Sequence, residues 1–183
     1  TAHAVYACRD DQNEVQYEDI VVVGHSLGSV IAYDVLNRLI NQDDLSGGPQ
    51  SQSCDNILLE DLGVSRRTKL LLTFGSPLDK TAFIFARHDP NGGSDRDALA
   101  ASVQPLIARE REFPWVNVYS PFDILGGSLE YYDTPPGDES PNVENRVDNQ
   151  VDPMAITPLS AHSEFWSNAL IYDRIFEALP TRG

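Results

Sequence analysis

Cysteine and basic residues are scarce in this chain, and long hydrophobic runs are absent. The 183 residues include only two cysteines, Cys8 and Cys54, and one widely spaced pair decides neither a disulfide nor a redox compartment. No apolar run approaches the roughly 20 residues that a membrane-spanning helix needs. No Cys/His cluster has the spacing of a zinc site, and no glycine-rich phosphate loop occurs. The sequence therefore predicts neither a metal ion nor another cofactor.

Positive charge is in deficit. The chain has 13 Lys and Arg residues against 28 Asp and Glu residues, which gives a formal net charge of −15 at pH 7. A nucleic-acid backbone would be repelled by this charge, and an anionic membrane is disfavoured for the same reason. Much of the acidity lies in predicted loops, as at Asp43-Asp44 and Asp138-Glu139, which is typical of a solvated surface. We therefore expect no nucleic-acid partner and no anionic-membrane partner.

Short apolar runs alternate with amphipathic or polar stretches, and this alternation predicts an α/β fold with a mostly parallel sheet and flanking helices. Strands are predicted at three apolar runs, residues 20–24, 69–74 and 115–119. Helices are predicted after the first strand and then over residues 97–112 and 165–179. The last helix carries an apolar stripe formed by Phe165, Trp166, Leu170, Ile171, Ile175, Phe176 and Leu179.

The remaining stretches lack a regular hydrophobic pattern. Residues 1–19 are predicted to hold the end of a helix and a polar connection. Residues 41–56 and 126–160 are rich in residues that favour turns, and they are predicted as surface loops. The length suits one hydrophobic core, so residues 1–183 are predicted to form a single domain.

The pentapeptide Gly24-His25-Ser26-Leu27-Gly28 directly follows the apolar run at residues 20–23. It fits the G-x-S-x-G nucleophile elbow, in which a buried strand ends in a sharp turn and a helix begins at once. The turn strains the backbone of Ser26 and exposes its hydroxyl. Side chains two residues to either side are expected to collide, so Gly24 and Gly28 are both predicted to be required. A serine in an ordinary strand-to-helix turn is the alternative interpretation.

A serine needs two partners before it can act as a nucleophile. Its hydroxyl reacts poorly at neutral pH until an oriented imidazole accepts its proton. Partners are expected beyond the carboxyl ends of the parallel strands, where such sheets bind ligands. Asp123 comes just after the strand at 115–119, and His162 is predicted to lie in a loop just before the last helix. Ser26, Asp123 and His162 are therefore predicted as nucleophile, acid and base.

Other side chains compete for these roles. Asp79 also follows a strand end and is the alternative acid, although it would equally be a loop aspartate paired with Lys80. Among the histidines, His25 is expected to pack or to form local hydrogen bonds. His3 precedes the nucleophile, and His88 lies in a polar loop before the acid, where a solvated surface role is expected.

Three stretches together resemble the α/β-hydrolase superfamily, in particular its lipase-like and esterase-like serine hydrolases. They are residues 24–29, residues 73–78 with their Phe-Gly-Ser-Pro turn, and residues 117–123 with the later His162. The resemblance implies cleavage of a small-molecule carboxylic ester through an acyl-enzyme on Ser26. It also implies that the backbone N–H of Leu27 belongs to the oxyanion hole. Acyl transfer and amide hydrolysis use the same residues, and a non-catalytic binding domain would keep only the fold.

The chain departs from that family at its start. Family members usually have several strands before the nucleophile strand, whereas nineteen residues precede Ile20 here. We expect the chain to be the C-terminal part of a longer hydrolase, or a second chain to complete the sheet; a minimal sheet is the third alternative. Without such a partner, the first strand would be an apolar, aggregation-prone edge. The second oxyanion donor has no counterpart in the sequence.

The substrate is not specified by any motif. Two apolar groups, residues 83–85 and the residues around the acid (Phe122, Ile124 and Leu125), would line an acyl pocket or pack loops onto the sheet.

Overall fold

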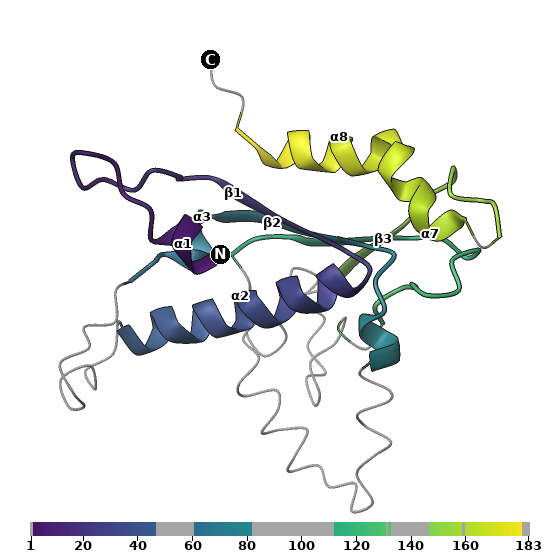
Figure 1. The fold of residues 1–183 in the computed structure, drawn as a ribbon, viewed down its shortest axis with the longest axis horizontal. Coiled ribbons are helices and arrows are strands. Elements are labelled where there is room, and N and C mark those ends of the chain that lie inside the picture. Colours follow the sequence, from purple (N-terminus) through teal and green to yellow (C-terminus); the bar gives the residue numbers. More distant parts are fainter. Residues whose placement is uncertain are drawn as a thin grey trace, which may run out of the picture.

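The computed structural model describes residues 2–46, 61–81, 112–130, 132, 147–158 and 160–180 (Figure 1). In chain order the elements are α1 (Ala2–Tyr6), β1 (Ile20–His25), α2 (Leu27–Ser46), α3 (Val64–Arg67), β2 (Thr68–Phe74), β3 (Trp115–Tyr119), β4 (Val147–Val151), α7 (Ala161–Glu164), the 3-10 turn η2 (Phe165–Ser167) and α8 (Ala169–Ala178).

The described strands form one parallel sheet in the order β1-β2-β3-β4. Every residue of β2 is buried except Lys69, as expected for a strand that helices cover on both faces. Leu71 pairs with Val22 on β1 and with Trp115 on β3, so the three predicted strands lie next to one another. The predicted α/β class with a parallel sheet and flanking helices is confirmed.

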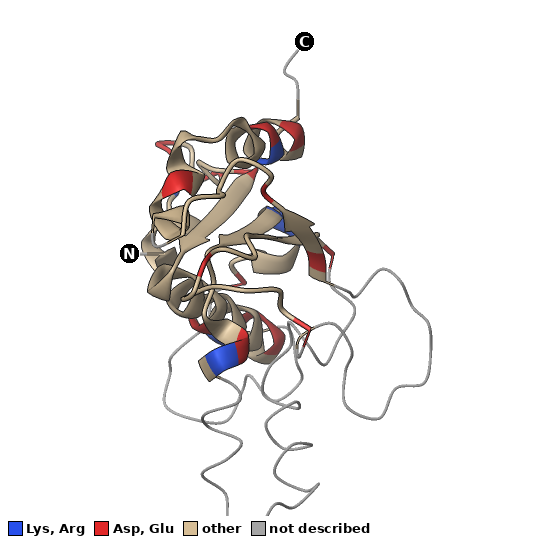
Figure 2. Ribbon diagram, turned by 90° about the vertical axis from the view of Figure 1, so that its right-hand side faces the viewer, with Lys and Arg blue, Asp and Glu red and all other residues tan. Residues whose placement is uncertain are grey.

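Helices cover the two faces of the sheet. α2 lies on one face and α8 on the other (Figure 1). Side chains alternate along β2: Leu71 enters the core on the α2 face, whereas Leu70 and Leu72 enter the core beneath α8. In Figure 2 the acidic positions lie mainly on the helices and loops outside the sheet.

A buried arginine fixes the N-terminal segment to the sheet. Arg67, which is 4% exposed, donates to the backbone carbonyls of Tyr6 and Leu62 at 2.6 and 2.8 Å. Its Nε and Nη2 atoms donate to the carbonyl of Tyr17 at 2.8 and 2.5 Å. One guanidinium therefore joins the end of α1, the connection before β1 and the start of α3.

The expected loops contain regular structure. β4 lies inside the predicted loop 126–160, and α2 continues to Ser46, inside the predicted loop 41–56. β4 was not predicted because its sequence, Val-Asp-Asn-Gln-Val, is mostly polar. Its Asn149 side chain accepts a hydrogen bond from Asn117 on β3 at 2.9 Å, which explains a polar residue in the sheet. The helix predicted over 97–112 lies outside the described residues except for Glu112, which is not helical.

The final helix is not continuous. Asn168 has an extended backbone (φ −98°, ψ 139°), so the predicted helix at 165–179 is divided into η2 and α8. The predicted apolar stripe is divided too: Phe165 and Ile171 are fully buried, whereas Trp166 is 49% and Phe176 is 71% exposed. His162 lies within α7, not in a loop.

β1 lies at the edge of the described sheet, where its one described neighbour is β2. Val23 on this strand is 39% exposed. Within the described part of the chain, no helix has both the length and the apolar character needed to cross a membrane. Cys8 is a free thiol that donates to Gln16 Oε1 at 2.7 Å, and Cys54 lies outside the described residues.

Candidate active site

The backbone at Ser26 has the strain expected of a nucleophile elbow. Ser26 lies between β1 and α2 with φ 53°, in the left-handed region that non-glycine residues rarely adopt. A Cβ atom at Gly24 would lie 2.6 Å from Ser29 Cα, so only glycine fits there. At Gly28 an added Cβ would meet no described atom within 4 Å. The expectation of a collision at Gly28 is therefore wrong.

Buried serine hydroxyl groups form hydrogen bonds next to the elbow. Ser29 Oγ donates to the carbonyl of Ser26 at 2.5 Å, and Ser76 Oγ lies 2.7 Å from Ser29 Oγ. Because the Ser29 hydrogen is already used, Ser76 is the donor in the second bond. Ser76 Oγ in turn accepts from the N–H of Leu78 at 3.3 Å. This chain of hydroxyls was not predictable from the sequence, since serines near strand ends give no distinctive signal.

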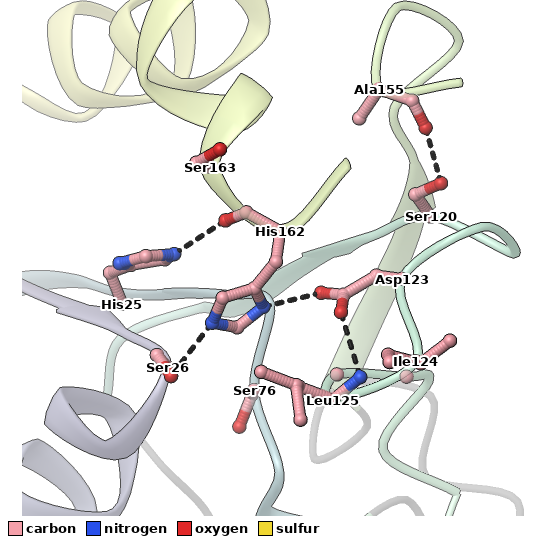
Figure 3. A network of polar contacts seen from close by, with 12 residues as sticks. His25, Ser26, Ser76, Ser120, Asp123, Ile124, Leu125, Ala155, His162 and Ser163 are labelled. Carbon is pink, nitrogen blue, oxygen red and sulfur yellow. Dashed lines mark hydrogen bonds and ion pairs between the residues drawn. The ribbon is translucent and has the colours of Figure 1, made fainter. Parts of the chain in front are cut away.

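Ser26, His162 and Asp123 form a continuous chain of hydrogen bonds (Figure 3). His162 Nε2 lies 2.8 Å from Ser26 Oγ, and His162 Nδ1 lies 2.8 Å from Asp123 Oδ2. A carboxylate only accepts hydrogen bonds, so Nδ1 carries the hydrogen when the imidazole is neutral. Nε2 is then free to accept the hydroxyl proton of Ser26. The three residues come from distant parts of the sequence and meet beyond the carboxyl ends of β1 and β3.

Asp123 is suited to remain ionised. Burial raises the pKa of its carboxyl, but hydrogen bonds from His162 and from the backbone N–H groups of Gly126 and Leu125 outweigh burial and hold the pKa below its usual value. The Leu125 N–H donates to Oδ1 at 2.8 Å (Figure 3). An ionised carboxylate at this position orients the His162 ring and stabilises its protonated form.

The lowered pKa of Asp123 predicts how stability depends on pH. A carboxyl whose folded-state pKa is depressed stabilises the fold above its unfolded pKa of about 3.9, and this contribution is lost as the pH falls through the folded-state value. We therefore expect Asp123→Asn to lower the free energy of unfolding at pH 7. The deficit relative to the wild type should shrink below about pH 4. Urea unfolding of both proteins from pH 7 to pH 2.5 measures this, and a deficit independent of pH would contradict it.

A glycine in the acid loop packs directly against this pair. A Cβ atom at Gly126 would lie 2.4 Å from the carbonyl carbon of Gly75 and 2.7 Å from Asp123 Oδ2. Any side chain at position 126 would therefore displace the carboxylate or the strand end beside it. The adjacent glycines at 126 and 127 are visible in the sequence, but the contact with Asp123 depends on the fold.

The alternative acid lies elsewhere. Asp79 Oδ2 accepts from the backbone N–H of Glu130 at 2.9 Å, whereas the carboxylate on His162 is that of Asp123. Lys80, the expected partner of Asp79, donates to the carbonyls of Ile124 and Gly126 at 2.6 and 3.3 Å. Lys80 thus anchors the loop that carries Asp123.

The surroundings of Ser26 offer a backbone donor and apolar side chains. Leu27 is the first residue of α2, where backbone N–H groups lack intrahelical partners and attract negative charge. Exposed apolar side chains follow the carboxyl ends of β3 and β4: Phe122, Ile124, Leu125, Met154 and Ile156. The apolar residues 83–85 lie outside the described residues. Within the described ranges, no group of three or more His, Cys, Asp or Glu side chains is arranged to hold a metal ion.

Comparisons of the chain with protein-family profiles, curated proteins and solved structures gave no match. The function is therefore inferred from the geometry of Ser26, His162 and Asp123.

Proposed function

We propose that this chain carries the catalytic centre of an α/β-hydrolase-type serine hydrolase that cleaves a carboxylic ester through an acyl-enzyme on Ser26. The observation that carries the proposal is the unbroken Ser26–His162–Asp123 chain, with 2.8 Å at both hydrogen bonds. The positive φ of Ser26 supports it independently, because such strain is typical of functional positions.

In the proposed reaction, each step uses a group of this site. His162 Nε2 accepts the hydroxyl proton as Ser26 Oγ attacks the ester carbonyl, and Asp123 stabilises the resulting imidazolium. The N–H of Leu27 donates to the negative oxygen of the tetrahedral intermediate. His162 then returns the proton to the departing alkoxide, which leaves as an alcohol. Water, deprotonated by the same imidazole, attacks the acyl-enzyme. The bond between the acyl carbon and Ser26 Oγ then breaks, His162 returns the proton to Ser26 Oγ, and the acid leaves.

The exposed side chains favour an ester with an apolar acyl group. Leu27 is 63%, Ile124 is 68% and Leu125 is 52% exposed, all in segments that also carry residues of the site. When an acyl chain covers apolar side chains of this kind, the burial of their surface favours binding by roughly 25 cal/mol per Å².

Two alternatives depend on the same residues. An alcohol or an amine that replaces water would make the protein an acyltransferase, and an amide that replaces the ester would make it an amidase. A non-catalytic binding domain would leave Ser26 unreactive. Among the described strands β1 lies at the edge of the sheet, and this supports a proposal that another strand, from a preceding segment or a second chain, completes the sheet.

A matched pair of chromogenic substrates tests the proposed reaction. We expect folded protein to hydrolyse 4-nitrophenyl butyrate and to leave the corresponding 4-nitroanilide almost unchanged. Hydrolysis of the anilide at a similar rate would favour the amidase alternative. Failure to cleave esters from acetyl to octanoyl would contradict the proposed function.

Acyl-chain preference gives a further prediction. Ile124→Ser should lower kcat/KM for the octanoyl ester about 3- to 10-fold, because roughly 1 kcal/mol of apolar contact is lost. The acetyl ester should change less than about twofold. Phe176→Ser is the matched control, since Phe176 is 71% exposed on α8 and Figure 1 places the end of α8 away from α7. Equal losses for both esters in Ile124→Ser would contradict an acyl-binding role.

The two candidate acids are separated by paired amide substitutions. Asp123→Asn should lower kcat by about 10⁴, because an asparagine at this position favours the wrong imidazole tautomer. Asp79→Asn should stay within about tenfold of the wild type, since the carboxylate on His162 is that of Asp123 and Asp79 Oδ2 accepts from the N–H of Glu130. The reverse order of losses would transfer the acid role to Asp79.

A further inference from the structure

His25 lies next to the proposed catalytic base, His162, but is not part of the hydrogen-bond chain that joins Ser26, His162 and Asp123. It is the last residue of β1 and immediately precedes Ser26. Its ring stacks on Phe74 at a centroid distance of 4.9 Å and lies 4.8 Å from the ring of His162. In Figure 3 the His25 side chain points toward the main chain of His162.

Two hydrogen bonds define the tautomer of the neutral His25 ring. Its Nε2 lies 2.9 Å from the backbone carbonyl oxygen of His162, which only accepts. Its Nδ1 lies 3.3 Å from Trp166 Nε1, which only donates. One state satisfies both partners, namely the neutral imidazole with its hydrogen on Nε2. A doubly protonated ring would set Nδ1–H against the indole N–H and lose the contact with Trp166.

The bond to the His162 carbonyl reaches the element that carries the base. α7 has only four residues, and so short a helix depends on outside contacts for its position. The bond runs from the residue before Ser26 to the main chain of His162, so it ties the elbow to α7 directly. Trp166 packs edge-on against the His25 ring at 5.4 Å and 75°, which limits rotation of the imidazole.

We propose that His25 is a positioning residue, which holds the backbone of His162 so that Nε2 of the base stays within hydrogen-bonding distance of Ser26 Oγ. This inference rests on the proposed function, in which His162 is the base. Trp166 supports the same hydrogen bond, because its indole N–H favours the His25 tautomer that donates to the carbonyl of His162. Without this bond α7 can shift, and a displacement of about 1 Å at a reacting group costs about 10²-fold in rate.

Three substitutions test the role of the Nε2–H donor. His25→Phe keeps an aromatic ring against Phe74 but removes the donor, and we expect kcat to fall roughly 10- to 100-fold with KM within about twofold. His25→Gln places an amide N–H near the Nε2 position, so kcat should return to within about fivefold of the wild type. Trp166→Phe should lower kcat less than His25→Phe, and the double variant should show no added loss, since both act through one bond.

His3→Phe is the matched control, since His3 is exposed on α1, and it should leave kcat unchanged. Rescue by glutamine and a loss confined to kcat support the positioning role. A wild-type kcat in His25→Phe, or equal losses in His25→Phe and His25→Gln, would overturn it.

A second measurement does not depend on catalysis. Two-bond ¹H–¹⁵N NMR spectra report the tautomer of each histidine, and we expect His25 to carry its hydrogen on Nε2 in the wild type. A hydrogen on Nδ1 would overturn the inference whatever the activity. A wild-type protein with the expected tautomer but no ester turnover would contradict the proposed function while leaving the His25–His162 bond in place.

Discussion

Ser26→Ala is expected to lower kcat/KM for a 4-nitrophenyl ester by about 10⁴- to 10⁶-fold, the range seen when the nucleophile of a serine triad is removed. The reason is that no other hydroxyl lies within hydrogen-bonding distance of His162 Nε2 among the described residues. The fold should be little changed, because among the described residues the Ser26 side chain hydrogen-bonds to His162 alone. Progress curves at several substrate concentrations measure the loss.

Ser163→Ala is the matched control for this substitution. Ser163 is an exposed neighbour of His162 (Figure 3). Its hydroxyl donates to the backbone carbonyl of Ser160 at 2.9 Å. Its removal should change kcat/KM less than about threefold, in line with a surface substitution. Equal activity of Ser26→Ala and the wild type would remove Ser26 from the mechanism.

Arg67→Met is expected to lower the free energy of unfolding by about 2 to 4 kcal/mol. The substitution keeps a long buried side chain but leaves the carbonyls of Tyr6, Tyr17 and Leu62 without their donor. Each unsatisfied buried carbonyl costs about 1 to 3 kcal/mol. Removal of a buried charge returns part of its desolvation cost, which keeps the net loss below the sum of the three.

Urea unfolding followed by circular dichroism measures this loss, and Arg66→Met provides the control. Arg66 is the exposed neighbour of Arg67, so its replacement should cost less than about 0.5 kcal/mol. Similar losses in the two variants would show that Arg67 contributes no more than an ordinary surface arginine.

The parts of the fold that were predictable from sequence are those with a strong local pattern. The β-branched run at 20–23, the leucine run in β2 and the β3 run at 115–119 all form strands. β2 and β3 are almost wholly buried, whereas the run in β1 is half-buried and its Val23 is exposed. β4 was not predictable, since two valines flank three polar residues, of which Asn149 hydrogen-bonds to Asn117 on β3. The break at Asn168 was also missed, because the apolar spacing continues across it.

In the candidate site, too, some features were predictable from the sequence and others were not. The elbow motif, the predicted strand ends and the order of residues along the chain were sufficient to identify Ser26, Asp123 and His162 as candidates. The contacts of Gly126, Ser76 and His25 depend on which loops meet in space, and no local pattern reveals that. Gly28 shows the opposite error, because the motif led us to expect a collision that the helix start does not produce.

The most direct test of the proposed catalytic centre is reaction with a fluorophosphonate, followed by intact and peptide mass spectrometry. Such a reagent modifies an activated serine and barely reacts with an ordinary hydroxyl. We predict a single adduct on Ser26 that is lost in His162→Ala and retained in Ser163→Ala. Folded protein with no adduct, or with adducts spread over exposed serines, would contradict an assembled Ser26–His162–Asp123 centre.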